Sequence, residues 1–470
     1  MHRSPQKGIM LVQVLIFGAI AALIIGAIVT WAGNSLRDAR YTAQREQAFY
    51  IAEAGIEYYR WHLAHAQQDF QDGTGAPGPY VHNYYDTSGV LLGTYSLTIT
   101  PPLPGSTIVT IKSAGRIVSN PNVVRTIEAR LAIPSLAKYA FVANTDIRFG
   151  AGTEVFGALH SNNGIRFDGI AHNVVTSAVA SYDDPDHAGA NEYGVHTHTP
   201  VDPLPPTAVP NVPAVFEAGR SFPVPALDFN GFTADLADMK TSAQSGGRYL
   251  APSADDGYQI ILRTDDTMDV YRVNSLRNPP GACSNSASQT DWGTWSINTR
   301  TFIANYPIPA NGIVFVEDDV WVEGQINTAR VTIAAAKFPE SASDLKHITV
   351  NNDLRYTNYD GQDVISLVAQ GNVNVGLYSD DNLQIDAALL AKSGRVGRHY
   401  YASNCSANYV RNQLTLFGMI ATNQRYGFAY TDGTGYTNRT ITYDANLLYS
   451  PPPSFPLSSD QYSTISWREL

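Results

Sequence analysis

Histidines and carboxylates, the side chains that hold metals and move protons, are concentrated in a few short stretches of this sequence. His196 and His198 occur in the stretch HTHT and could chelate a transition metal from one face of a strand, although two ligands do not complete a site. Acidic clusters could bind Ca²⁺ through oxygen ligands, or supply the acid pairs of a polysaccharide-cleaving enzyme. These clusters are Asp183, Asp184 and Asp186 with His187; Asp265 and Asp266; Glu317, Asp318 and Asp319; and Asp380 and Asp381. Because all four lie in turn-like stretches, we expect solvated corners, with no catalytic residue and no resident metal, and leave Ca²⁺ as the one cofactor still open.

Motifs of the common enzyme classes are missing. The sequence has no GxSxG, no HExxH and no Walker loop. The stretch GAGTEVFG at 150–157 has the wrong spacing for a dinucleotide-binding loop, and no helical pattern follows it. We therefore expect no enzymatic activity, and keep a membrane-tethered polysaccharide-active enzyme as the alternative.

One segment combines cations with aromatic rings. It is AKSGRVGRHYYASNC at 391–405, which also contains His399. Cations beside stacking rings hold single-stranded nucleic acid, and rings also stack on sugars. The formal net charge of −11 disfavours nucleic acid, and an ordinary loop fits the same pattern. The candidate ligand-contact residues are Lys392, Arg395, Arg398, Tyr400 and Tyr401.

The chain has two cysteines, Cys283 and Cys405. They can form one disulfide if this part of the chain lies outside the cytoplasm. Two unrelated free thiols are the equally good alternative.

The first element that the pattern predicts is a long N-terminal helix over 9–67. No charged residue occurs from Gly8 to Leu36, which is longer than the apolar core of a secretion signal and enough to span a bilayer, so 9–33 is predicted to be transmembrane. The helical pattern then continues without proline to 67. An apolar stripe with helical spacing runs along this second half and must pack on a folded domain. The stripe is Phe49, Ala52, Ile56, Tyr59 and Leu63.

The remaining sequence predicts two kinds of β structure. Alternating strands over 95–134, with a turn at SNPN, indicate a small antiparallel sheet within 68–137 that covers the helix. From 138 to 470, short apolar segments are separated by Gly, Asn and Asp. Starts near Val331, Ile348, Ile365 and Leu383 are about 17–18 residues apart, a coil length that favours a β-solenoid over a sandwich or jelly roll.

A proline-rich excursion interrupts the predicted solenoid at about 181–310. Within it, the spacing of Phe232, Leu236 and Met239 predicts a short helix, and a hairpin is predicted around Asp265 and Asp266. We expect the excursion to pack on the flank of the solenoid.

The stretch KGIMLVQVL resembles the class III signal of type IV prepilins, a short basic leader ending in Gly before an apolar helix. The resemblance implies a leader at 1–8, cleavage between Gly8 and Ile9 by a prepilin peptidase, and methylation of the new N-terminus. Gln13 stands where most major pilins carry Glu, and lack of that Glu marks some minor or tip-located pilins. AEAGIE at 52–57 resembles the EAG-type helix of PilX-like minor pilins.

A second resemblance lies in the distal part. GQDVISLVAQGNVNV, LQIDAALLA and RTITYDANLLYSPPPSFP resemble the C-terminal region of large prepilin-like proteins with a right-handed β-helical body. The fold class expected is therefore an α+β pilin-like module, a long helix plus a small antiparallel sheet, followed by a mainly-β right-handed β-solenoid. The proline run within 443–456 is expected to close the last coil, because proline cannot continue a ladder.

Together these resemblances imply a minor pilin or pseudopilin-like component of a type IV pilus or type II secretion-like filament. Its expected place is the tip, where it would initiate assembly and contact a surface, a glycan or DNA. The partners implied are prepilin peptidase, other pilins and the assembly machinery. The implied location is the bacterial inner membrane, N-terminus in the cytoplasm, and then the cell surface. A stand-alone adhesin held by an uncleaved helix is a further alternative.

Overall fold

The structure is a computed structural model that describes residues 7–102, 106–448, 450–458 and 461–470. The chain divides into two compact units. Unit 1 comprises Met1–Pro101, Val109–Ala132 and Tyr462–Leu470, and unit 2 comprises Pro102–Ile108 and Ile133–Gln461. The sequence places one boundary between the antiparallel sheet (68–137) and the solenoid (138–470). The observed division differs, because Tyr462–Leu470 belongs to unit 1 and unit 2 begins again at Ile133.

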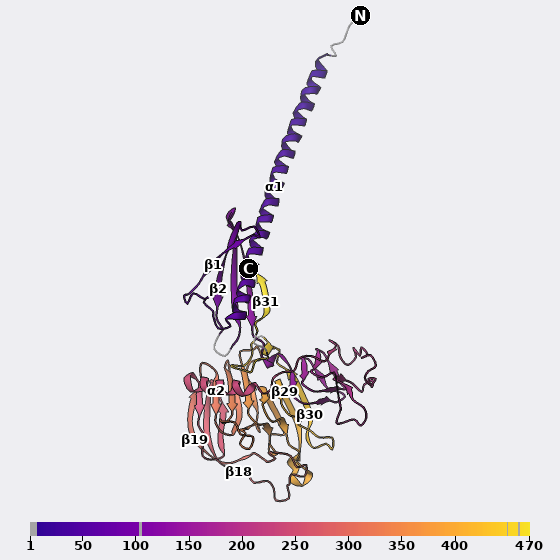
Figure 1. Ribbon diagram of the computed structural model, residues 1–470, viewed down its shortest axis with the longest axis vertical. Helices are drawn as coiled ribbons and strands as arrows, with labels where there is room; N and C mark the ends of the chain where they lie inside the picture. Colours follow the sequence, from indigo (N-terminus) through magenta and orange to yellow (C-terminus); the bar gives the residue numbers. More distant parts are fainter. Residues whose placement is uncertain (1–6, 103–105, 449, 459–460) are drawn as a thin grey trace. The chain divides into compact units, whose positions relative to one another are not determined.

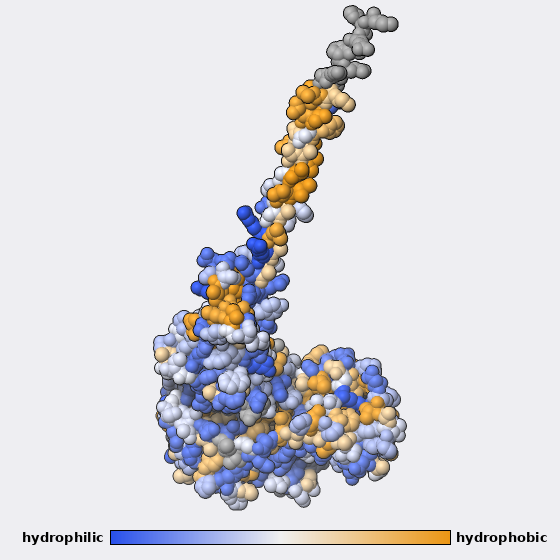
Figure 2. Space-filling view, turned by 45° about the horizontal axis from the view of Figure 1, so that its top comes forward, coloured by the Kyte–Doolittle hydropathy of each residue, from blue (hydrophilic) through white to orange (hydrophobic). Residues whose placement is uncertain are grey.

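Unit 1 is built on one continuous helix, α1 (Lys7–His65), as the pattern predicts (Figure 1). Its first half is apolar and exposed all round, visible as the orange stretch of the rod in Figure 2. Its second half buries four of the five residues of the predicted stripe, since Ala52, Ile56, Tyr59 and Leu63 are at most 3% exposed, whereas Phe49 is partly buried. The change from an all-round apolar surface to a one-sided stripe is the reason that only the second half packs on the sheet.

The sheet of unit 1 is antiparallel with strand order β1-β2-β3-β4-β31. Its strands are β1 (Tyr80–Tyr85), β2 (Leu91–Thr100), β3 (Val109–Ile117), β4 (Asn120–Ala132) and β31 (Ser463–Glu469). β2, β3 and β4 confirm the predicted alternation. β31 comes from the other end of the chain and pairs with β4, where Arg468 forms an ion pair with the buried Glu128. Its Trp467 makes an edge contact with Phe49 of α1.

Glycine lets α1 approach the sheet at backbone distance. A Cβ on Gly115 of β3 would lie 2.1 Å from the Ala48 carbonyl oxygen and 2.5 Å from the Ala52 nitrogen. On the helix side, a Cβ on Gly55 would lie 2.3 Å from Ser113 Oγ. At Gly115 the near atoms are helix backbone, which cannot move aside, so this glycine sets the depth at which the helix packs. At Gly55 the near atom is a side-chain oxygen.

Unit 2 is mainly β and is dominated by parallel strand pairs. One ladder runs through ten strands, each parallel to the next. In order they are β16 (Arg248–Leu250), β20 (Ile313–Val316), β22 (Arg330–Ala335), β25 (Val364–Ala369), β27 (Asn382–Ala391), β29 (Val410–Thr422), β5 (Phe141–Ala143), β8 (Leu159–Ser161), β11 (Val175–Ser177) and β15 (Arg220–Ser221). The order is permuted relative to the chain: β5, early in unit 2, lies next to β29, near its end.

A second series of parallel pairs runs alongside the first. It contains β17 (Gly257–Leu262), β21 (Val320–Ile326), β23 (Ile348–Thr349), β24 (Leu354–Tyr356), β26 (Val373–Val375) and β28 (Val396–Arg398). β18 (Thr267–Leu276) pairs antiparallel with β17 and with β19 (Ile297–Pro307), which confirms the hairpin predicted around Asp265 and Asp266.

Shorter elements complete unit 2. β6 (Ile147–Phe149), β9 (Ile165–Phe167) and β14 (Val195–His196) form a parallel three-stranded sheet, and β30 (Gly435–Tyr443) runs parallel to β29. The two small pairs are β7 (Glu154–Val155) with β10 (Ile170–Ala171), and β12 (Ser181–Tyr182) with β13 (Glu192–Tyr193). The 3₁₀ turns are Leu136–Lys138, Ser403–Cys405, Ala407–Tyr409 and Ala445–Leu448.

The predicted repeat over 331–383 is wrong in its spacing. Val331 pairs directly with Ile365, whereas Ile348 belongs to the second series and pairs with Val320 and Val373. Val331, Ile365 and Leu383 lie in strands of the first ladder (β22, β25 and β27), whereas Ile348 does not, so a spacing of 17–18 residues is not the repeat of one ladder. The short spacing does occur in 141–177, where Phe141 pairs with Leu159 and Leu159 with Val175.

Both faces of the first ladder are buried, which explains its unbroken apolar runs. In β22, Val331, Ile333 and Ala335 enter one core, whereas Ala334 faces the other way. Helix α2 (Phe232–Gly246) covers this second face with Phe232, Leu236 and Met239, and it confirms the short helix predicted there.

The proline run also lies along the ladder. The carbonyl oxygen of Pro453 accepts a 2.6 Å hydrogen bond from Thr332 Oγ1, and that of Pro451 accepts one of 2.6 Å from Arg330 Nη2. Phe455 is buried in the core beneath α2. The expectation that this run closes the last coil is thus wrong: it covers a side of the ladder at β22, a face that would otherwise expose apolar side chains.

Candidate functional site

The N-terminal helix places two of the predicted assembly residues. Gly8 and Ile9 are helical residues of α1, and Gln13 is exposed in its apolar half. Residues 1–6 of the expected leader lie outside the described residues. Among the helices that the structure describes, α1 is the one that is long and apolar enough to cross a membrane. An apolar surface on all sides of a helix needs a bilayer or other helices around it.

The basic and aromatic segment is not the ligand-contact surface that the sequence predicts. Arg398 is fully buried, and its guanidinium donates hydrogen bonds to the carbonyl oxygens of Gly376, Leu377 and Asn408. It also lies 4.9 Å from the ring centroid of Tyr401. No ion pair of Arg398 occurs among the described residues, so backbone carbonyls and aromatic rings replace water around this charge.

The other four candidate residues are engaged in the same way. Lys392 is buried and pairs with Glu340, and Arg395 donates hydrogen bonds to the Arg398 carbonyl oxygen and to Tyr430 Oη. Tyr401 is 1% exposed, and its hydroxyl donates to the carbonyl oxygen of Gly293. Tyr400 is half-buried and donates a 2.9 Å hydrogen bond to Asp432. The five side chains hold this part of unit 2 together rather than presenting themselves to a ligand.

Burial shifts the titration of this segment. Loss of solvent lowers the pKa of Arg398 to about 10 and, with the nearby charges of Arg395 and His347, lowers the pKa of His399 to about 3. His399 is therefore neutral in the folded protein at neutral pH, and it packs its ring 4.9 Å from that of Trp295.

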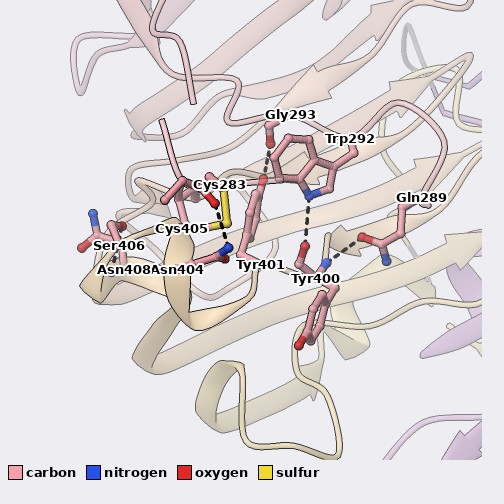
Figure 3. The surroundings of a disulfide bond; sticks show 12 residues. Cys283, Gln289, Trp292, Gly293, Tyr400, Tyr401, Asn404, Cys405, Ser406 and Asn408 are labelled. Carbon is pink, nitrogen blue, oxygen red and sulfur yellow. Dashed lines mark hydrogen bonds between the residues drawn. A yellow bond between two sulfur atoms is a disulfide. The ribbon is translucent and has the colours of Figure 1, made fainter. Parts of the chain in front are cut away.

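Cys283 and Cys405 form a disulfide, the first of the two alternatives left by the sequence. Figure 3 shows the bond between the loop before β19 and the 3₁₀ turn after Tyr401. Hydrogen bonds on either side join the same two segments: Trp292 Nε1 donates to the Tyr400 carbonyl oxygen at 3.0 Å, and the Tyr400 nitrogen donates to Gln289 Oε1 at 2.7 Å. The disulfide thus fixes a strand-free loop onto the buried basic and aromatic segment.

Three of the acidic clusters act as local hydrogen-bond acceptors. Asp266 Oδ1 accepts from the Asn327 nitrogen at 2.9 Å, Asp319 Oδ1 from the His347 nitrogen at 2.7 Å, and Asp381 Oδ1 from the Asn412 nitrogen at 3.0 Å. Burial raises the pKa of Asp319, and burial also raises the pKa of Asp380. In the cluster at 317–319, Glu317 pairs with Lys240. These carboxylates stabilise turns and loops.

The fourth cluster differs, because histidines join it. His187 Nδ1 lies 3.1 Å from Glu192 Oε1, and His198 Nε2 lies 3.5 Å from the same oxygen. His196 Nε2 lies 3.5 Å from Asp184 Oδ2, and burial lowers the pKa of His196, which favours the neutral ring. The sequence reasoning treated HTHT and the acids at 183–187 as separate features and missed Glu192. The signal available was the number of ligand-type side chains within 184–198.

Comparison with known proteins identifies no family. No family model matches the chain, and no curated protein matches it. Among solved structures, one that is similar is the crystal structure of the competence-associated pilin ComZ from Thermus thermophilus, at 14% sequence identity. The match covers 91% of this chain and 98% of that chain with a TM-score of 0.29.

Proposed function

We propose that this chain is a minor pilin or pseudopilin-like subunit of a type IV pilus or type II secretion-like filament. One observation carries the proposal: α1 is a single helix with two different halves. The first half is exposed and apolar on every side. The second half packs its apolar stripe against an antiparallel sheet and shares a hydrophobic core with it. Such a helix suits a bilayer before assembly and a bundle of like helices afterwards.

Processing at the start of α1 is part of the proposal. A prepilin peptidase cuts between Gly8 and Ile9, and the new N-terminus is methylated. Gln13 lies on the exposed apolar half of the helix, where it can donate and accept hydrogen bonds but cannot form an ion pair with a neighbouring N-terminal amine. This supports a subunit with no other subunit ahead of it, at the filament tip.

Unit 2 is the part displayed outside. We assign it to the right-handed β-solenoid class, and its parallel ladders and buried two-faced strands support that assignment. Its role in the proposal is to initiate assembly at the tip and to contact a surface, a glycan or DNA. The segment 391–405 is not the contact surface in this proposal, because Lys392, Arg398 and Tyr401 are buried.

No bond-making chemistry is part of this proposal. The protein is held in the bacterial inner membrane with its N-terminus in the cytoplasm and then moves to the cell surface with the filament. Its partners are the peptidase, other pilins and the assembly machinery. A stand-alone adhesin would keep the same helix in the membrane, uncleaved.

Substitution of Gly8 tests the proposal in the source bacterium. In Gly8→Val the peptidase loses the residue that precedes its cut, so we expect the full-length chain to accumulate in membranes and to be absent from sheared surface filaments. The control is Gly150→Ala in unit 2, at a position away from α1 where a Cβ meets no atom within 4 Å, and we expect this variant to enter filaments normally. An equal distribution of Gly8→Val and the unaltered chain would refute filament assembly by this route.

A further inference from the structure

Five side chains of metal-ligand type converge in the segment 184–198. Asp184 follows β12, Glu192 lies in β13 and His196 in β14. His198 is two residues after His196 and shares its side of the extended chain. His187 lies in the turn between β12 and β13. Pairing of β12 with β13, and of β14 with β9, brings these positions together from one short stretch of chain.

The ligand atoms fall into two overlapping triads that share His198. One triad is His187, Glu192 and His198, and the other is Asp184, His196 and His198; within each, all atoms lie within 4.8 Å of one another. A tetrahedral ion with bonds of about 2.0–2.1 Å places its ligand atoms about 3.3 Å apart. The distances from Glu192 Oε1 to His187 Nδ1 and to His198 Nε2, 3.1 Å and 3.5 Å, match this spacing.

Unsatisfied polar atoms are the independent sign that a ligand belongs here. Glu192 is 1% exposed, yet its Oε2 has no hydrogen-bond partner within the described part of the chain, and neither has His198 Nε2. Buried polar atoms are almost always satisfied in folded proteins, and a buried carboxylate beside two histidines is costly to leave without a cation.

The surrounding groups orient His198 without neutralising Glu192. The backbone nitrogen of His198 donates a 2.8 Å hydrogen bond to Asp168 Oδ1. The other oxygen of Asp168 accepts a 2.8 Å hydrogen bond from Arg166 Nε, and Arg166 Nη1 lies 3.5 Å from Asp184 Oδ2. The arginine is therefore committed to Asp168 and Asp184, and no ion pair between Glu192 and an arginine or lysine occurs among the described residues.

We propose that His187, Glu192 and His198 bind one divalent transition-metal ion of the Zn²⁺ class. Two imidazoles and one carboxylate suit this class, whereas Ca²⁺ requires six to eight oxygen ligands. The ion ties the turn between β12 and β13 to the chain after β14, a stretch held by only short strand pairs. Asp184 and His196 lie next to this site, because they belong to the second triad, which also contains His198.

Metal titration of the full-length, untagged protein in detergent tests the assignment. After dialysis against a chelator, Zn²⁺ is titrated in competition with a chromophoric chelator, and Co²⁺ is added separately to record its visible absorption. We expect one equivalent of tightly bound Zn²⁺ and a tetrahedral Co²⁺ spectrum. His187→Ala changes an exposed side chain, and Glu192→Gln keeps the buried shape; each is expected to weaken Zn²⁺ binding by at least about 10–100-fold.

Two further variants make the result decisive. His65→Ala removes an exposed histidine on α1 and is expected to bind Zn²⁺ like the unaltered protein. His196→Gln is expected to bind Zn²⁺ more tightly than His187→Ala does, because only His187 is a proposed ligand. The proposal is overturned if the unaltered protein binds no more tightly than Glu192→Gln, or if His196→Gln loses the ion while His187→Ala keeps it, since the ion would then belong to the other triad.

Discussion

At the scale of single residues, Arg398 shows why the basic and aromatic pattern was misleading. A sequence reveals that a cation is present but not where its charged end lies. Here the partners are carbonyl oxygens of Gly376, Leu377 and Asn408, which the strand pairing around β26 and β28 brings to one point. Cations between aromatic rings serve equally to hold a ligand and to fill the interior, so this pattern alone could not separate the two.

His399 makes stability depend on pH in a defined direction. Its pKa is 6.5 as the ordinary value and about 3 in the fold, chiefly because of burial. When the pH falls below 6.5, the unfolded chain takes up a proton that the folded chain refuses until about pH 3. Above pH 6.5 the ring is neutral in both states, and His399 does not lower the free energy of unfolding. Between pH 6.5 and 3, the free energy of unfolding falls by about 1.4 kcal/mol for each unit by which the pH is lowered.

The measurement is denaturant unfolding of the protein and of His399→Phe at pH 7 and pH 5. Phenylalanine keeps the ring that contacts Trp295 and removes the titrating group. We expect the unaltered protein to lose about 2 kcal/mol more than the variant over this interval. An identical pH dependence of the two proteins would show that the ring is protonated at no cost in the fold.

At the scale of elements, the packing of α1 on β3 depends on Gly115. In Gly115→Ala, the new Cβ would collide with the backbone of α1 at Ala48 and Ala52. Backbone cannot move aside as a flexible side chain can, so we expect a loss of about 1–3 kcal/mol in the stability of unit 1. Hydrogen exchange of peptides from 44–65 and 109–117 measures it locally, as faster exchange.

The matched control is Gly150→Ala, at a glycine where a Cβ meets no atom within 4 Å. Its exchange in the two peptide regions is expected to equal that of the unaltered protein. Unchanged exchange in Gly115→Ala as well would mean that α1 is not held against the sheet at the distance described.

Elements with a local signal were predictable, and elements defined by distant partners were not. α1, α2, β2 to β4 and the hairpin at 265–266 follow from periodicity and turn residues within one window of sequence. β31 pairs with β4 across most of the chain, and β5 with β29, so no local pattern reveals them. The misjudged spacing at 331–383 has the same origin, since turn length rather than strand pattern sets which strands pair.

The candidate sites follow the same division. The apolar half of α1 is a local property, and the structure keeps it exposed. The surroundings of segment 391–405 and the meeting of Glu192 with His187 and His198 depend on strand pairing, so the sequence pointed to the residue types but not to their roles.

At the scale of the whole molecule, both the apolar helix and the last strand belong to unit 1, whereas unit 2 is inserted between them in the chain. In the proposed function, the unit that enters a membrane or a filament and the unit that is displayed are separate compact units of one chain. This division suits a subunit that anchors through one unit and carries the other, which is the organisation expected of a large minor pilin.

The most direct test of this account is the N-terminal mass of the mature protein from native membranes, with and without prepilin peptidase. We predict a chain that starts at N-methylated Ile9, and a chain that keeps Lys7 and Gly8 when the peptidase is deleted. A mature chain that starts at Met1 or His2 in both strains would contradict the filament assignment and leave a protein anchored by an uncleaved helix. A start near Asn34 would show that the apolar half is a discarded secretion signal, and would contradict the assignment equally.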